Sequence, residues 1–279
     1  MKPLSTSVYT FSKLINGGFL YVDKTAHIYD LIRPAFGQYF MARPRRFGKS
    51  LLISTLKSIF CGQRELFEGL AIADTDYDWK TYPVIHLDMG SVRATSVNEL
   101  ETNLLRKVMH NAAAHDCSIP EHDCYQAFED LVLQVSKCQG GVVILVDECD
   151  KPLLGHLGQE SVKAIQNVLK AFYSVIKSTE PQQRFALLTG VSKFSKVSVF
   201  SDLNNLTDLT MNRRAATMLG YTQAELEANF PDYITRLAEA EDQSQEEILQ
   251  RLSGWYNGYR FEENAETVYN PVSVMKCFL

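Results

Sequence analysis

The residues Gly48-Lys49-Ser50 could bind a phosphate group. They follow a short apolar segment, 38–42, and precede an amphipathic stretch with Leu52, Leu56 and Ile59 on one face. The N–H groups at a helix N-terminus bind phosphate oxygens, a lysine there reaches the terminal phosphates, and the serine hydroxyl ligates Mg²⁺. Strand, turn, Gly-Lys-Ser and helix therefore predict a phosphate-binding loop (P-loop). Its predicted nucleotide-binding residues are Arg45, Arg46, Phe47, Gly48, Lys49, Ser50 and Leu51.

The first position of this loop departs from the usual pattern. Five residues before Gly48, where the pattern has a glycine, the chain has Arg43 followed by Pro44. A glycine is favoured where the turn needs a positive φ, whereas a residue before proline enters extended. The alternative interpretation is a basic turn that is capped by Ser50 and binds no phosphate.

A second motif supplies carboxylates. The apolar run 142–146 leads directly into Asp147-Glu148. At the tip of a strand, Asp147 could hold Mg²⁺ and Glu148 could polarise the water that attacks a γ-phosphoryl group. The alternative is a helix cap or a surface pair. An Asp-Glu that follows a Gly-Lys-Ser, with a strand between them, is much less expected by chance than either motif alone.

Two further places could contribute to the same chemistry. Thr189 and Ser192, which follow the strand predicted at 184–188, are candidate sensors of the γ-phosphate, and a Thr-Gly turn with a helix cap is the alternative. Arg213-Arg214 could supply a charge-stabilising arginine, either to its own site or to a neighbouring subunit in a homo-oligomer. A solvated basic surface is the alternative for this pair.

The composition is that of an ordinary globular protein, with 46% hydrophobic and 22% charged residues over 279 positions. The net charge of −5 does not imply wholesale nucleic-acid binding. The six cysteines form no Cys-x-x-Cys pair and are expected to be reduced. A zinc site at His115, Cys117, His122 and Cys124 would match no standard spacing. Without an apolar signal segment or an 18-residue apolar run, we expect a cytoplasmic protein that does not enter the membrane.

Strands that alternate with helices predict an α/β fold, with a mostly parallel sheet covered by helices. We expect strands at 38–42, 83–88, 142–146 and 184–188, and helices at 26–33, 49–60, 97–114, 125–138 and 161–178. From about residue 210 the pattern becomes helical, and Thr222…Glu225 and Ser244…Glu247 have the spacing of capping boxes. We therefore expect a P-loop core over 1–210 and a small helical lid with an aromatic-rich segment over 211–279.

The end of the chain is apolar. Residues 255–270 are rich in Tyr, Asn and Gly and predict a hairpin or loop, and the last residues have no polar tail. We expect this segment to pack on the lid and its far end to be cut before a further domain. On that hypothesis Val274, Phe278 and Leu279 should be exposed, whereas the core of one complete domain would bury them.

Several long motifs together resemble the AAA-ATPase-like family of bacterial proteins, over nearly the whole chain. They are the residues at 21–25 (Tyr-Val-Asp-Lys-Thr), 43–50, 145–153, 189–200, 203–208, 255–261 (Trp-Tyr-Asn-Gly-Tyr-Arg-Phe) and 269–271 (Tyr-Asn-Pro). In that family an arginine at position 43 is normal, and an aromatic residue is usual where Cys149 stands. The resemblance implies a nucleotide-binding fold, and members are often followed by a PD-(D/E)XK nuclease-like domain.

These observations lead to one hypothesis and two rivals. We expect a P-loop ATPase with ATP and Mg²⁺ as ligands, in which Lys49 holds the β- and γ-phosphates, Ser50 and Asp147 the metal, and Glu148 the water, with Thr189 assisting. Hydrolysis would switch the lid or a C-terminal effector. The first rival is a nucleotide-gated binding module with little or no turnover. The second is a subunit that acts on nucleic acid, which only the nuclease-like companion of the family supports.

Overall fold

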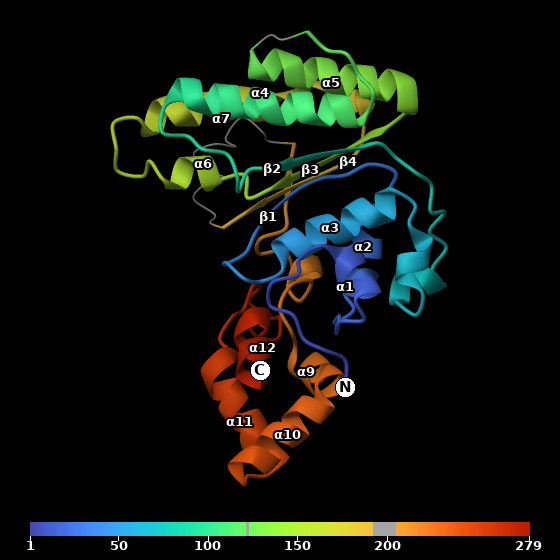
Figure 1. Cartoon of the computed structure of the whole chain (residues 1–279), viewed down its shortest axis with the longest axis vertical. Helices are drawn as coiled ribbons and strands as arrows, with labels where there is room; N and C mark the ends of the chain where they lie inside the picture. The colour runs from blue at the N-terminus through green and yellow to red at the C-terminus, as the bar shows by residue number, and fades with distance from the viewer. Residues whose placement is uncertain (121–122, 192–204) are drawn as a thin grey trace.

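The computed structural model describes residues 1–120, 123–191 and 205–279, and its centre is a five-stranded sheet in which every neighbouring pair is parallel (Figure 1). The strands lie in the order β2-β3-β4-β1-β5. Their bounds are Gln38–Ala42 (β1), Val84–Asp88 (β2), Val142–Asp147 (β3), Gln183–Gly190 (β4) and Thr207–Asp208 (β5). The predicted α/β fold is confirmed.

Helices cover both faces of the sheet (Figure 1). One face carries α4 (Val97–Ala114), α5 (Cys124–Gln139) and α7 (Val162–Ser178). The other carries α3 (Lys49–Phe60), with α1 (Phe11–Asn16) and α2 (Thr25–Ile32) beyond it. Two separate hydrophobic clusters fill the two layers. Both faces of the sheet are thus withdrawn from water, as a parallel sheet requires.

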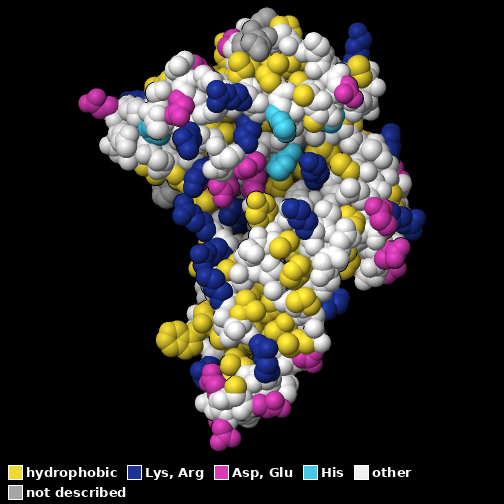
Figure 2. Space-filling model, in the orientation of Figure 1, with side chains coloured by type: hydrophobic (Ala, Val, Ile, Leu, Met, Phe, Trp, Pro, Cys, Tyr) yellow, Lys and Arg dark blue, Asp and Glu magenta, His cyan; other side chains and the backbone are white. Residues whose placement is uncertain are grey.

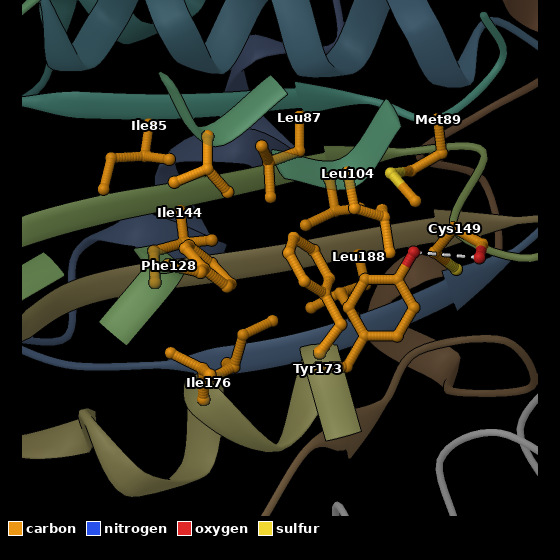
Figure 3. Packing of buried hydrophobic residues seen from close by; sticks show 14 of the residues in the cluster. Ile85, Leu87, Met89, Leu104, Phe128, Ile144, Cys149, Tyr173, Ile176 and Leu188 are labelled. Carbon is orange, nitrogen blue, oxygen red and sulfur yellow. Dashed lines mark hydrogen bonds between the residues drawn. The ribbon is translucent and has the colours of Figure 1, made fainter. Parts of the chain in front are cut away.

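The local sequence accounts for these elements. All six residues of β3 are buried, which explains its continuous β-branched run. The helix α4 begins where Ser96 accepts a hydrogen bond from the backbone N–H of Glu99. Figure 3 shows the packing between the sheet and the helices. In the same cluster the rings of Phe128 and Phe172 stack, with ring centroids 4.9 Å apart. The expected helix and strand positions are confirmed, with small shifts at their ends.

The C-terminal helices form a third cluster at the end of the molecule away from α4 and α5 (Figure 1). They are α9 (Gln223–Asn229), α10 (Pro231–Glu241), α11 (Gln245–Tyr256) and α12 (Pro271–Phe278). Both predicted capping boxes are present, at the start of α9 and of α11. Leu4 and Val22, from the beginning of the chain, pack into the same cluster.

The expected exposure of the C-terminal segment is wrong for two of its three residues. Val274 is fully buried and Phe278 is 3% exposed, while Leu279 is 72% exposed. The reason is that α12 is amphipathic and turns Val274 and Phe278 into the cluster with Phe230, whose ring stacks on Phe278. The segment packs on α10 and α11, the helices before it, as expected.

Short elements complete the fold. The four-residue helix α6 (Lys151–Leu154) follows the carboxylate motif, and short 3₁₀ turns occupy Arg64–Phe67, Ala71–Asp74, Glu180–Gln182 and Arg213–Ala215. The hairpin expected near 255–270 is reduced to one antiparallel bridge between Tyr259 and Val268, because α11 extends to Tyr256. Across the described residues, no helix combines the length and the apolar composition that spanning a bilayer would need.

Candidate nucleotide site

A cavity of about 410 Å³ adjoins the predicted phosphate-binding loop. All seven predicted nucleotide-binding residues, 45–51, line it together with Glu148. Its other walls come from the entry segment, including Tyr9 and Lys24, and from the C-terminal part, including Tyr221 and Met275. Figure 2 shows Lys and Arg side chains gathered along one edge of the waist between the sheet and the C-terminal helices, with Asp and Glu side chains beside them. The cavity therefore combines charged groups with an apolar wall.

The loop before α3 is shaped to present backbone N–H groups. Gly48 takes a left-handed conformation, with φ of +91°, which an L side chain rarely adopts. A helix has no internal acceptors for its first N–H groups, and no side chain among the described residues caps α3 at Gly48. The N-terminus of α3 is therefore open to an anionic ligand. Arg46 also has a positive φ, of +69°, so the loop is held in a conformation that is unfavourable for its own sequence.

Lys49 is the first residue of α3 and is only 6% exposed. Its ammonium donates to the carbonyl oxygens of Arg43, at 2.9 Å, and Pro44, at 3.0 Å. Burial lowers the pKa of Lys49, and the carboxylates of Asp147, Glu148 and Asp150 oppose that shift. The structure thus brings the loop lysine and the carboxylate motif into one electrostatic environment.

The carboxylate motif lies at the carboxyl end of β3, next to the end of β4. The Asp147 carboxylate, 6% exposed, accepts a hydrogen bond from the Thr189 hydroxyl at 2.5 Å. The backbone N–H of Glu148 donates to Asp147 Oδ1, at 3.0 Å, and to Thr189 Oγ1, at 3.2 Å. Glu148 has a φ of +52°, a left-handed conformation that is costly for a non-glycine residue. The two hydrogen bonds from its N–H stabilise that turn and orient the carboxylate-bearing residue.

Contacts behind this turn hold it against the core. The hydroxyl of Tyr173, on α7, donates to the carbonyl oxygen of Cys149 at 3.0 Å (Figure 3). Asp150 is fully buried and accepts a hydrogen bond from the backbone N–H of Val191 at 2.8 Å. The turn after β3 is therefore tied to both α7 and the segment after β4.

Sequence reasoning missed Gly90. A Cβ at this position would lie 2.9 Å from Glu148 Oε2 and 3.0 Å from Asp88 Oδ1. A side chain there would displace the carboxylates, so the glycine allows the loop after β2 to approach Glu148. The signal in the sequence was only a glycine two residues after the predicted strand, which is no more than a turn indicator.

The other predicted residues are distributed as follows. Arg45 and Arg46 are exposed, whereas Phe47 is 1% exposed and packs against aromatic side chains from the C-terminal part. Arg213 and Arg214 are exposed on a 3₁₀ turn, and neither lines the cavity. Ser192 lies outside the described residues, as does His122 of the weighed zinc set.

The donor set fits Mg²⁺ better than a soft metal. Ser50 and Asp147 offer a hydroxyl and a carboxylate, and Mg²⁺ binds through one or two carboxylates together with substrate phosphates and water. Within the described ranges, no group of three or more His, Cys, Asp or Glu side chains could hold a metal by itself. Asp147 and Ser50 could accordingly hold Mg²⁺ only in company with phosphate oxygens.

Comparison with known proteins bears on this site. The family model for predicted AAA-ATPases matches residues 5–200. An uncharacterized protein in the vnfD 5′ region of Azotobacter chroococcum mcd 1 is 37% identical over 281 residues, and this chain spans about half of its length, 52%.

Two solved structures are similar to parts of the chain. The Orc1 protein of Aeropyrum pernix, solved in complex with DNA, has 15% identity and a TM-score of 0.43, over 83% of this chain and 58% of that chain. Cdc6p from Pyrobaculum aerophilum has 12% identity and a TM-score of 0.30, over 88% and 52%. The family match covers well over half of the sequence and includes both chemical motifs. The chain belongs to the family of predicted AAA-ATPases.

Proposed function

We propose that this protein binds ATP with Mg²⁺ and hydrolyses the bond between its β- and γ-phosphates. The observation that carries the proposal is that Lys49, at the open N-terminus of α3, and Glu148 line one cavity. Residues 45–51 would contact the phosphates, and Ser50 and Asp147 would hold the metal. When bound, Mg²⁺ neutralises phosphate charge and orients the phosphates.

Glu148 is proposed as the general base. Glu148 lines the cavity, and its backbone N–H donates to the side chains of Asp147 and Thr189. It would take the proton of the attacking water, while Thr189 keeps Asp147 oriented. General-base catalysis of this kind contributes a factor of about 10²–10⁴.

The apolar wall of the cavity suits a nucleobase. Leu20, Leu219, Tyr221 and Met275 line it on the side of the entry segment and the C-terminal part. A base placed there would contact both the P-loop core, proposed as 1–210, and the lid, proposed as 211–279. Hydrolysis would then change the contacts that hold the lid against the core, and through the lid those of a C-terminal effector.

A steady-state ATPase assay tests the proposal. We expect turnover of ATP by the parent protein that requires Mg²⁺. Glu148→Gln should bind Mg·ATP with the parent's affinity and turn over about 10²–10⁴-fold more slowly, because an amide fills the same space but accepts no proton. Equal turnover in Glu148→Gln would refute the assignment of the base. Tight binding with no turnover in the parent would instead favour the nucleotide-gated binding module.

A further inference from the structure

The aromatic-rich C-terminal segment packs directly on the phosphate-binding loop, although more than half of the sequence lies between them. The ring of Phe47 meets Tyr259 edge-on at 4.7 Å and Phe261 at 5.4 Å, measured between ring centroids. The guanidinium carbon of Arg43 lies 4.0 Å from the centroid of Phe261. The side chains of Phe47 and Arg43 are each only 1% exposed. One C-terminal segment therefore contacts both of these buried loop residues.

Arg43, which occupies the position of the missing glycine, faces the protein rather than the cavity. It donates through Nη1 to the carbonyls of Ala42, at 2.9 Å, and Thr210, at 2.7 Å, and through Nη2 to Ala215, at 2.7 Å. Burial lowers its pKa to about 10, and Asp208 opposes the shift. A guanidinium is costly to bury, so these carbonyls and the Phe261 ring stabilise it where it lies. Arg43 thus joins the end of β1 to the chain that follows β5.

Asn270 makes a second connection between the same parts. Its side-chain oxygen accepts from the backbone N–H of Ser273, at 3.1 Å, and caps α12. Its side-chain amide donates to the carbonyl of Arg45, at 3.3 Å. The Asn270 side chain, which is 8% exposed, therefore caps α12 and also holds Arg45. Arg45 directly precedes Arg46, the loop residue with a positive φ.

We propose that Arg43, Phe261 and Asn270 are positioning residues that hold the phosphate-binding loop in the conformation that receives the phosphates, and that they couple this loop to α12. This inference rests on the proposed nucleotide-binding function. None of the three needs to touch the ligand. A loop that is already ordered loses less conformational entropy on binding, so the contacts raise affinity for the phosphates and not for the nucleoside.

Two variants separate positioning from general stability. Asn270→Ser keeps an N-capping oxygen, since serine caps about as well as asparagine, but removes the amide donor to Arg45. Phe261→Leu keeps an apolar side chain but removes the ring that contacts Arg43. Trp255→Ala is the matched control, because Trp255 belongs to the same aromatic motif and is 80% exposed.

The readout is the ratio of two dissociation constants, for adenosine and for Mg·ATP, measured with the melting temperature of each variant. A purely structural defect reduces the binding-competent fraction for both ligands equally and leaves the ratio unchanged. We expect Asn270→Ser and Phe261→Leu to weaken Mg·ATP binding by about two- to tenfold, the loss of roughly one contact. Adenosine binding and the Trp255→Ala ratio should stay at parent values.

Two results would overturn the proposal. If the parent binds Mg·ATP and both variants keep the parent ratio, the segment does not position the loop, while the proposed function stands. If the parent and Trp255→Ala bind no Mg·ATP, both the positioning role and the proposed function are wrong.

Discussion

Lys24 and Glu225 form a partly buried ion pair that joins the entry segment to α9. The Lys24 ammonium lies 2.5 Å from both carboxylate oxygens of Glu225 and 2.8 Å from the carbonyl of Thr217. The two side chains are 9% and 24% exposed. Burial lowers the pKa of Lys24, and Glu225 opposes the shift. Glu225 also accepts from the backbone N–H of Thr222 in the capping box of α9.

The perturbation is Lys24→Met, which leaves the carboxylate without its cation. Removing one partner of a fully buried pair costs about 3–5 kcal/mol. Glu225 is a quarter exposed and keeps its bond from Thr222, so we expect the free energy of unfolding to fall by about 2–3 kcal/mol. The midpoint of urea unfolding should move accordingly. Lys13→Met, at an exposed lysine on α1, is the control.

A double-mutant cycle makes the reasoning refutable. Glu225→Gln retains a side chain that can complete a capping box and removes the charge. We expect Lys24→Met/Glu225→Gln to lose less stability than the sum of the two single variants, with a coupling of at least about 1 kcal/mol. Strict additivity, or a Lys24→Met stability within about 0.5 kcal/mol of the parent, would show that the pair does not stabilise the junction.

Two further predictions concern the turn after β3 and the dependence of stability on pH. Thr189→Val removes the hydroxyl that donates a hydrogen bond to the Asp147 carboxylate. ATP turnover should therefore fall by about tenfold or more and should require a higher Mg²⁺ concentration. An unchanged dependence of turnover on Mg²⁺ concentration would contradict this expectation. Burial lowers the pKa of His86 below its ordinary 6.5. As the pH falls, His86 is therefore protonated in the unfolded chain before it is protonated in the folded chain. The free energy of unfolding should therefore decrease as the pH falls below about 6.5. The decrease should be less steep in His86→Phe than in His110→Phe, the control at an exposed site. Equal slopes in the two variants would refute the contribution of His86.

The elements around the chemical motifs were predictable because their signals are local. A β-branched run before Asp147 and an amphipathic stretch after Ser50 specify a strand and a helix, and β3 and α3 lie there. The parallel register then follows, with Asp88 opposite Asp147 and Ala42 opposite Gly190. These pairings bring the ends of the strands to one edge of the sheet.

Other features were not predictable because they depend on contacts between distant residues. The two-residue β5 exists only as a partner of β1. The burial of Arg43 depends on carbonyls at 210 and 215 and on Phe261. The expectation that Arg43 enters the loop in an extended conformation used only its neighbour Pro44. The burial of Phe278 likewise depends on Phe230, between α9 and α10, a contact that the last residues alone cannot reveal.

Lys49, at the start of α3, is proposed to bind the phosphates of a nucleotide. The decisive measurement is calorimetric titration of Mg·ATP into the parent protein and into Lys49→Ala. We expect saturable binding by the parent and an affinity about tenfold to a hundredfold lower in the variant, since a charge-assisted contact contributes about 1.5–3 kcal/mol. Equal affinity in a folded Lys49→Ala protein, or no binding by the parent, would contradict it.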